Sequence, residues 1–188
     1  MISLIGLPGG GKSTVGRQLA RRLGVDFVDT DVVLEREIGS SIRSFFEREG
    51  EERFRDLEEA VLHRLVERRS GVIATGGGIV LRASNRALLH EKTHCVYLRA
   101  TPDELYRRLR HDTHRPLLQV ARPLDKLREL YQGRDPLYRE AAHFVIETGR
   151  PSVSLLVSMV LMQLELAGVL PTAPTESRGV AAGDNPGP

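Results

Sequence analysis

Short apolar, mostly β-branched runs alternate along the chain with longer stretches in which apolar residues recur at helical spacing. The short runs predict five strands, at residues 2–6, 26–30, 71–75, 94–99 and 143–147. Such alternation is typical of a mainly parallel sheet wrapped by helices, because parallel strands need a crossover connection. Since no linker or internal repeat interrupts the pattern, we expect a single α/β domain.

The stretches between the strands predict helices. Residues 13–23 read as a helix that ends at Gly24, and residues 51–69 have the strongest helical period in the chain. A further helix should begin after Thr101, because Thr101 and Glu104 have the spacing of a capping box and Pro102 occupies the first helical position.

Residues 151–170 are long and apolar enough to raise the question of a membrane span. Serines, a glutamine and a glutamate interrupt the segment, which favours a mostly buried C-terminal helix instead. Residues 169–188 are rich in proline, glycine and small residues, and we expect a disordered tail after a domain of residues 1–168.

Composition narrows the class of protein. A chain of 188 residues can bury one substantial core, and a net charge of +2 gives no strong field for nucleic acid or membranes. The basic residues are 24 arginines and only 3 lysines, which fits either a GC-rich genome or the binding of phosphates and carboxylates. One cysteine, Cys95, and no visible secretory leader suit a reducing, cytoplasmic setting.

The first candidate for chemistry is a glycine-rich loop near the N-terminus. The segment from Gly6 to Ser13 satisfies G-x-x-x-x-G-K-[ST], and it follows an apolar strand and opens a helix, as this motif requires. Its glycines let successive N–H groups point at phosphate oxygens, while Lys12 reaches the β- and γ-phosphates and Ser13 can ligate Mg²⁺. The loop predicts a nucleoside triphosphate site.

Two aspartates close the second predicted strand. Asp29 and Asp31 are two residues apart, so on a strand they would share a face at its C-terminal edge, where ligands bind in parallel sheets. One carboxylate could help hold the Mg²⁺ shell, and the other could accept a hydrogen bond from an attacking hydroxyl. The alternative is that Asp31 only caps the helix that follows.

Two arginines are further candidates. Arg55 lies three residues before Glu58, which could orient its guanidinium, although such a pair is more often a solvated surface pair. Arg134 stands just before a helix that Pro136 could begin. Neither arginine is specific in isolation.

A second glycine run, Gly76, Gly77 and Gly78, follows the third predicted strand. It has no Lys-Ser after it, so it is not a second triphosphate loop. A simple turn needs one or two glycines, whereas three favour close approach of a ligand to the backbone. We expect this loop to form part of an acceptor pocket.

The motifs "GLPGGGKST", "FVDTD", "FR" with Glu58, "TGGG", "RPLL" and "RDPLYR" occur in an order that resembles the shikimate kinase family, over residues 2–165. The resemblance implies a three-layer α/β/α P-loop kinase fold, with a five-stranded parallel sheet, helices on both faces and a mobile lid at about residues 111–123. It also implies transfer of the γ-phosphoryl group of ATP to the 3-hydroxyl of shikimate by a monomer that needs Mg²⁺.

The resemblance also implies roles for individual residues. Catalysis is assigned to Lys12, Asp31 and Arg115, and the metal to Ser13 and, through water, Asp29. The residues implied in ATP binding are Gly9, Gly10, Gly11, Lys12, Ser13, Thr14, Arg108, Arg115 and Pro151. Those implied in shikimate binding are Asp31, Arg55, Gly76, Gly77, Gly78 and Arg134. We further expect the neighbouring arginines to depress the pKa of Asp31.

Two other functions are compatible with parts of this pattern. Another small-molecule kinase, such as a gluconate or nucleoside-monophosphate kinase, would keep the first loop but gives no reason for "DTD", "TGGG" and "RDPLYR" together. A non-catalytic ligand sensor would be expected to lose acceptor-site residues, whereas Asp31, Arg55 and Arg134 are all present.

Overall fold

The computed structural model describes residues 1–68, 70–110 and 122–170. Its strands form one parallel sheet in the order β2-β3-β1-β4-β5. The strands are β1 (Ile2–Ile5), β2 (Phe27–Asp29), β3 (Val72–Ala74), β4 (His94–Arg99) and β5 (Phe144–Glu147). All five predicted strands are therefore confirmed, each to within one residue at either end.

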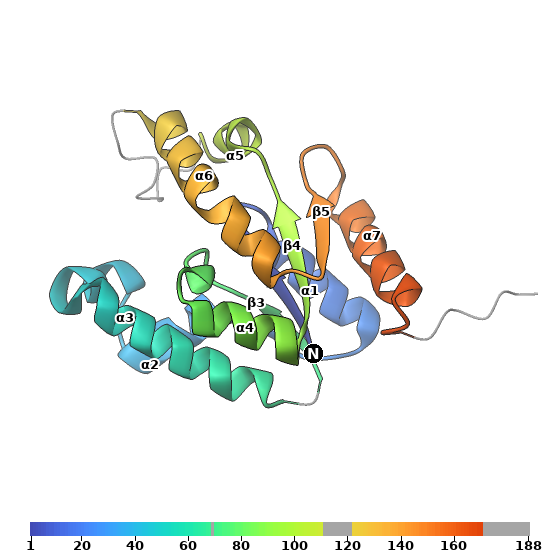
Figure 1. The fold of residues 1–188 in the computed structure, drawn as a ribbon, viewed down its shortest axis with the longest axis horizontal. Coiled ribbons are helices and arrows are strands. Elements are labelled where there is room, and N and C mark those ends of the chain that lie inside the picture. The colour runs from blue at the N-terminus through green and yellow to red at the C-terminus, as the bar shows by residue number, and fades with distance from the viewer. Residues whose placement is uncertain (69, 111–121, 171–188) are drawn as a thin grey trace, which may run out of the picture.

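Helices cover both faces of this sheet (Figure 1). The helices are α1 (Lys12–Leu23), α2 (Thr30–Ile38), α3 (Ile42–Val66), α4 (Ala83–Lys92), α5 (Pro102–Leu109), α6 (Pro123–Ala141) and α7 (Val153–Leu166), with a short 3₁₀ turn η1 (Ile79–Leu81). Helices α1 and α7 pack on one face, and α3, α4 and α6 pack on the other. The expected three-layer α/β/α arrangement is confirmed.

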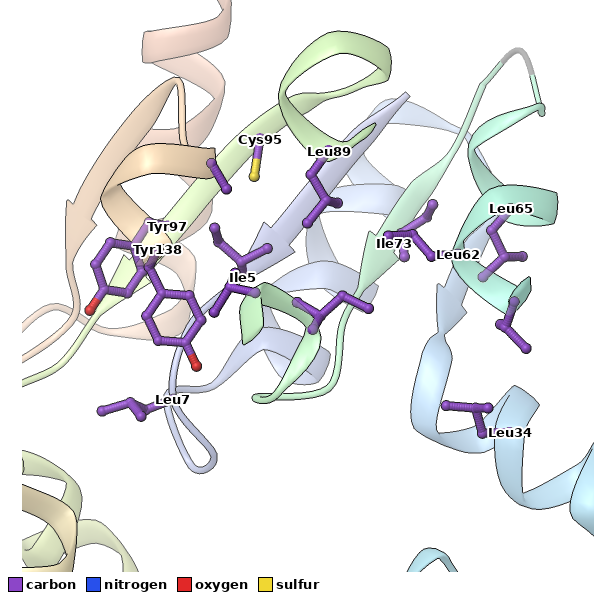
Figure 2. Close-up of a cluster of buried hydrophobic side chains, with 14 of the residues drawn as sticks. Ile5, Leu7, Leu34, Leu62, Leu65, Ile73, Leu89, Cys95, Tyr97 and Tyr138 are labelled. Atoms are coloured by element: carbon purple, nitrogen blue, oxygen red, sulfur yellow. The ribbon is translucent and has the colours of Figure 1, made fainter. Parts of the chain in front are cut away.

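The core lies in two parts because strand side chains alternate between the faces. On β1, Leu4 points into the cluster with α1 and α7, whereas Ile5 points into the cluster with α3, α4 and α6. Figure 2 shows the second cluster, in which Ile5 and Ile73 of the sheet face Leu62 and Leu89 of the helices. Cys95 is buried on β4 within the same cluster.

Several helices begin or end at the capping residues that the sequence predicted. Helix α1 ends at Gly24, which has the left-handed φ of 65° of a C-terminal cap. The capping box of Thr101 and Glu104 is present at the start of α5. The predicted helix over 51–69 is the second part of α3, which begins earlier, at Ile42, and is broken at Gly50 (φ 83°, ψ 170°).

One predicted helix start is wrong. Pro136 does not begin a helix but lies inside α6, which starts with another proline, Pro123, at its first turn. Proline removes one backbone hydrogen bond from a helix interior, but α6 continues because its buried residues, Leu127, Tyr138 and Ala141, pack against the core. Arg134 therefore projects from a continuous helix rather than from a loop.

Helix α7 confirms the buried C-terminal helix expected within residues 151–170. Its residues Leu156, Val157 and Val160 are buried against α1 and the sheet. No helix in the described ranges is both long and apolar enough to cross a membrane. Val169 and Leu170 still pack against this core, while residues 171–188 of the expected tail lie outside the described residues.

The C-terminal edge of the sheet gathers the segments that carry candidate chemistry. Because β2, β3 and β1 are neighbours and parallel, the residues that follow them leave the sheet at the same edge. These are Asp29 with the start of α2, the second glycine loop, and the first glycine loop. Segments far apart in sequence thus become neighbours.

Three histidines lie near the N-terminal end of β4, away from the edge that carries the glycine loops. The rings of His90 and His143 stack with centroids 4.3 Å apart, and His94 lies 6.4 Å from His143. The backbone N–H of Cys95 donates to Nδ1 of His143 at 3.1 Å. Burial, helped by the charges of His90 and His94, lowers the pKa of His143, so the folded protein favours its neutral form.

We expect His143 to contribute less to the stability of the protein as the pH falls from 7.5 to 5.5. A histidine whose pKa is lower in the folded state stabilises the fold above its unfolded pKa, and this stabilisation is lost as the pH drops. For a chain of this size, each 1 kcal/mol lost lowers Tm by about 2–4 °C. His143→Asn should flatten the profile, because the amide oxygen can accept the Cys95 bond without titrating.

The matched control is His63→Asn, at an exposed position on α3. Scanning calorimetry at several pH values should give the wild-type slope for this control. An unchanged slope in His143→Asn would show that the stacked histidines do not govern the acid sensitivity.

Candidate functional site

Two adjoining cavities occupy the C-terminal edge of the sheet. The first, of about 360 Å³, is lined by the first glycine loop and its helix, with Asp29, Asp31, Thr75 and Gly77. The second, of about 590 Å³, is lined by residues of α3 and by the second glycine loop. Pro8, Asp31 and Gly77 line both cavities. Two ligands could therefore meet beside Asp31.

The first cavity is lined by the first glycine loop and the start of α1. Gly9 and Gly11 have φ values of 83° and 89°, which only glycine adopts readily. Helix α1 begins at once after Gly11, with no acidic residue in its first turn. Lys12 is buried against the loop and donates to the carbonyls of Gly6 at 2.8 Å and Leu7 at 3.0 Å. The cavity is thus suited to an anion.

The hydroxyl of Ser13 and the carboxylate of Asp29 are in contact within this cavity, with Oγ donating to Oδ2 at 2.5 Å. Thr14 also lines the cavity. Among the described residues, no group of three or more His, Cys, Asp and Glu side chains forms a complete metal cage. Magnesium needs few protein ligands because it keeps several waters and phosphate oxygens, so Ser13 and Asp29 fit such an ion.

The two aspartates are arranged differently from the strand geometry we expected. Strand β2 ends at Asp29, and Asp31 lies in the first turn of α2. Asp29 is the residue that caps this helix, since its Oδ1 accepts the backbone N–H of Asp31 at 3.1 Å. The carboxylate of Asp31 is left to face both cavities.

The expected depression of the pKa of Asp31 is wrong. Burial raises the pKa of this carboxyl and the charge of Asp29 raises it further, while Lys12 and Arg55 offset these effects only in part. The sequence indicates the nearby cations but not the burial, which penalises the charged form.

Arg55 and Glu58 form a buried pair in the second cavity rather than a solvated surface pair. Arg55 donates to Glu58 at 2.5 Å and to Glu51 at 3.0 Å. Glu58 is only 1% exposed, and burial raises the pKa of its carboxyl although Arg55 and Arg134 lower it. The buried carboxylate thereby holds the Arg55 guanidinium at the cavity wall.

Two aromatic residues that the sequence reasoning missed complete this wall. The Arg55 guanidinium lies 5.3 Å from the Phe54 ring centroid and 5.8 Å from that of Phe46. Both rings line the second cavity. In the sequence these residues appear as the pair "FF" (Phe45 and Phe46) and as Phe54 at helical spacing. This pattern alone is equally typical of a helix that packs on an ordinary core.

Each glycine of the second loop lies where a side chain would collide with a site residue. A Cβ on Gly76 would lie 2.6 Å from Asp31, one on Gly77 would lie 2.6 Å from Pro8, and one on Gly78 would lie 2.4 Å from Arg55. None of the three has a positive φ. The three glycines therefore allow Asp31, Pro8 and Arg55 to lie close to the backbone of the second loop, and through Gly77 the second loop packs directly on the first.

Helix α6 contacts this loop from the other side. The Gly77 carbonyl accepts hydrogen bonds from Arg134 at 3.0 Å and from the Tyr138 hydroxyl at 2.6 Å. Tyr138 was not predicted, although it belongs to the quoted "RDPLYR" motif. The structure thus brings Asp31, Arg55 and Arg134 together with all three glycines at one edge of the sheet.

The residues assigned to the adenine lie outside the two cavities. Arg108 donates to the Thr148 carbonyl and, at 3.3 Å, to its hydroxyl. Pro151 follows three residues after Thr148, so α5 and the segment after β5 meet at this corner. Arg115 and residues 111–121 of the expected lid lie outside the described residues.

The chain is similar in sequence and in structure to known kinases. A sequence model of the shikimate kinase family matches residues 8–165. A shikimate kinase of Paracidovorax citrulli is 60% identical over 176 residues, covering 92% of this chain and 96% of its own. The solved structure of a shikimate kinase from Acinetobacter baumannii in complex with shikimate is 46% identical, with a TM-score of 0.83, covering 90% of this chain and 94% of its own.

A gluconokinase from Sinorhizobium meliloti is more distant. It is 19% identical with a TM-score of 0.55, over 88% of this chain and 91% of its own. At this identity the likeness shows a shared fold alone.

We expect Gly77→Ala to destabilise the protein by about 1–3 kcal/mol, because the new methyl group would press on the rigid ring of Pro8. Gly133→Ala is the matched control, since this glycine lies inside α6 and its added methyl group would meet no atom within 4 Å. The control should be neutral or stabilising by up to about 1 kcal/mol. Urea unfolding measures both, and equal stabilities would contradict direct packing of the two loops.

Proposed function

The chain belongs to the shikimate kinase family, and we propose that it transfers the γ-phosphoryl group of ATP to the 3-hydroxyl of shikimate, giving shikimate 3-phosphate. The observation that carries this proposal is the meeting of the two cavities at Asp31. A phosphate donor in the first cavity and a ring hydroxyl in the second would have their reacting atoms side by side. Phosphoryl transfer depends mainly on such positioning and on charge neutralisation.

The phosphate side of the reaction is assigned to the first loop. Gly9, Gly10, Gly11, Ser13 and Thr14 would surround the phosphates of ATP. Lys12 would move from the loop carbonyls that it now contacts to the β- and γ-phosphates. Its positive charge would stabilise the charge that builds up as the γ-phosphoryl group moves.

Ser13 and Asp29 would hold Mg²⁺, Ser13 directly and Asp29 through a water molecule. When bound, the ion neutralises charge on the phosphates. The 2.5 Å contact between Ser13 and Asp29 supports this assignment, because both oxygens lie on the phosphate cavity. Asp29 also caps α2, so its carboxylate is held in place before any ion arrives.

The acceptor side is assigned to the second cavity. Arg55 and Arg134 would bind the shikimate carboxylate, since a planar guanidinium matches a carboxylate with two parallel hydrogen bonds. Gly76, Gly77 and Gly78 would let the ring lie close to the backbone. Asp31 would accept a hydrogen bond from the 3-hydroxyl and act as its base, a role that its raised pKa supports.

The remaining assignments follow the family resemblance. Arg108 and Pro151 would contact the adenine; Arg108 donates to Thr148, three residues before Pro151 in the sequence. Arg115, on a lid of about residues 111–123, would close over the γ-phosphoryl group. We further propose a kinase domain that extends past the expected boundary at residue 168 to Leu170, since Val169 and Leu170 pack against the core. We propose that it works as a cytoplasmic monomer without nucleic acid or membrane.

A substrate panel tests the function. With fixed Mg²⁺ and ATP, coupled ADP release should depend on added shikimate and should stay at background with gluconate or nucleoside monophosphates. Release driven by gluconate would favour the other small-molecule kinase. ATP or shikimate binding without any ADP release would favour the ligand sensor.

Lys12→Ala should lower turnover by roughly 10²- to 10³-fold, because the charge facing the migrating phosphoryl group is lost. Lys92→Ala is the control, at an exposed position at the end of α4. Steady-state kinetics at saturating shikimate measure both variants. Near-normal turnover in Lys12→Ala would reject the role of the first loop.

Asp31→Asn should lower kcat by roughly 10²-fold or more if Asp31 both takes the proton and orients the hydroxyl. The amide keeps the shape of the side chain but cannot accept a proton. Shikimate KM, measured in the same assay, should change much less than kcat. A loss of kcat below about tenfold would restrict Asp31 to orientation.

A further inference from the structure

The Gly77 carbonyl has two donors from the same helix. Arg134 and Tyr138 are four residues apart on α6, so their side chains lie on one face. Arg134 donates to this oxygen at 3.0 Å and Tyr138 donates to it at 2.6 Å. A carbonyl oxygen has two lone pairs and can accept both bonds, so one donor could leave while the other keeps the oxygen paired.

The two donors, Arg134 and Tyr138, differ in their other roles. Under the proposed function, on which this inference rests, Arg134 binds the shikimate carboxylate. Its Nη1 group donates to the Gly77 carbonyl, and binding the substrate carboxylate through Nη1 and Nη2 would give up this bond. Without a second donor, the partly buried Gly77 carbonyl would then be left unpaired, which is destabilising, and the glycine loop would be free to shift.

We propose that Tyr138 is a positioning residue for the acceptor substrate. Its hydroxyl keeps the Gly77 carbonyl in place while Arg134 exchanges that carbonyl for the substrate carboxylate. The loop then stays packed against Pro8 and Arg55 during binding, and the exchange leaves no unsatisfied carbonyl behind.

The surroundings of Tyr138 suit a rigid donor. Its side chain is completely buried, and its ring stacks on Tyr97 with centroids 4.8 Å apart (Figure 2). The Tyr97 hydroxyl is directed elsewhere and donates to Asp135 at 2.9 Å. Asp135 also accepts from Arg99 at 3.1 Å, which ties α6 to β4.

The phenol of Tyr138 remains a neutral donor at working pH, because burial raises its pKa well above the usual range. The Arg134 guanidinium, in contrast, sits at the end of a long side chain that is partly exposed. One donor is therefore held in the core and the other can move.

The test is Tyr138→Phe, which removes the hydroxyl and keeps the stacked ring. Shikimate KM should rise roughly 3- to 10-fold, the change expected for one neutral hydrogen bond, while ATP KM and kcat stay within about twofold. Tyr97→Phe is the matched control, because it removes a phenol hydroxyl from the same stack without touching Gly77. It should leave shikimate KM unchanged, and urea unfolding checks that both variants are folded.

A purely structural role would lower stability without separating the two KM values. An unchanged shikimate KM in folded Tyr138→Phe, or equal rises in both KM values, would overturn the proposal. If the wild-type enzyme gives no shikimate-dependent ADP release, the proposed function fails instead, so the two failures are distinguishable.

A crystal structure of the wild-type protein with shikimate provides a second test that needs no variant. The proposal expects Arg134 on the carboxylate and the Tyr138 hydroxyl still within hydrogen-bond distance of the Gly77 carbonyl. If Arg134 stays on Gly77, or the Tyr138 hydroxyl leaves it, the proposal is wrong.

Discussion

The contact between the two glycine loops is the constraint on which the site depends. Gly77 lies against the Pro8 ring so closely that a single added carbon atom would come within 2.6 Å of it. This contact places the first and second cavities side by side, with Asp31 lining both. The parallel order β2-β3-β1 makes the contact possible, since it brings the ends of three strands to one edge.

Burial raises the pKa values of two acidic groups in the site. Asp31 and Glu58 both have raised pKa values because they are removed from water, and the nearby cations offset this only in part. Glu58 accepts a hydrogen bond from Arg55 at 2.5 Å, and this bond directs the Arg55 guanidinium to the cavity wall. Asp31 keeps its carboxylate open to both cavities. One buried acid thus positions the Arg55 guanidinium, and the other lines both cavities.

The sequence predicted what local patterns determine and missed what distant contacts determine. The strands and the first loop follow from short motifs, and their positions are confirmed. Pro136 was misread because core packing of α6 outweighs the loss of one backbone bond. The hydroxyl of Tyr138 and the rings of Phe46 and Phe54 are recognisable only when Gly77 and Arg55 are seen beside them.

The most direct test of this account is a structure of the protein with shikimate and a non-hydrolysable ATP analogue. We expect the carboxylate of shikimate on Arg55 and Arg134, its 3-hydroxyl within hydrogen-bond distance of Asp31, and the γ-phosphate in the first cavity beside that hydroxyl. Shikimate bound elsewhere, or with its 3-hydroxyl turned away from Asp31, would contradict the meeting of the two cavities as the reaction site.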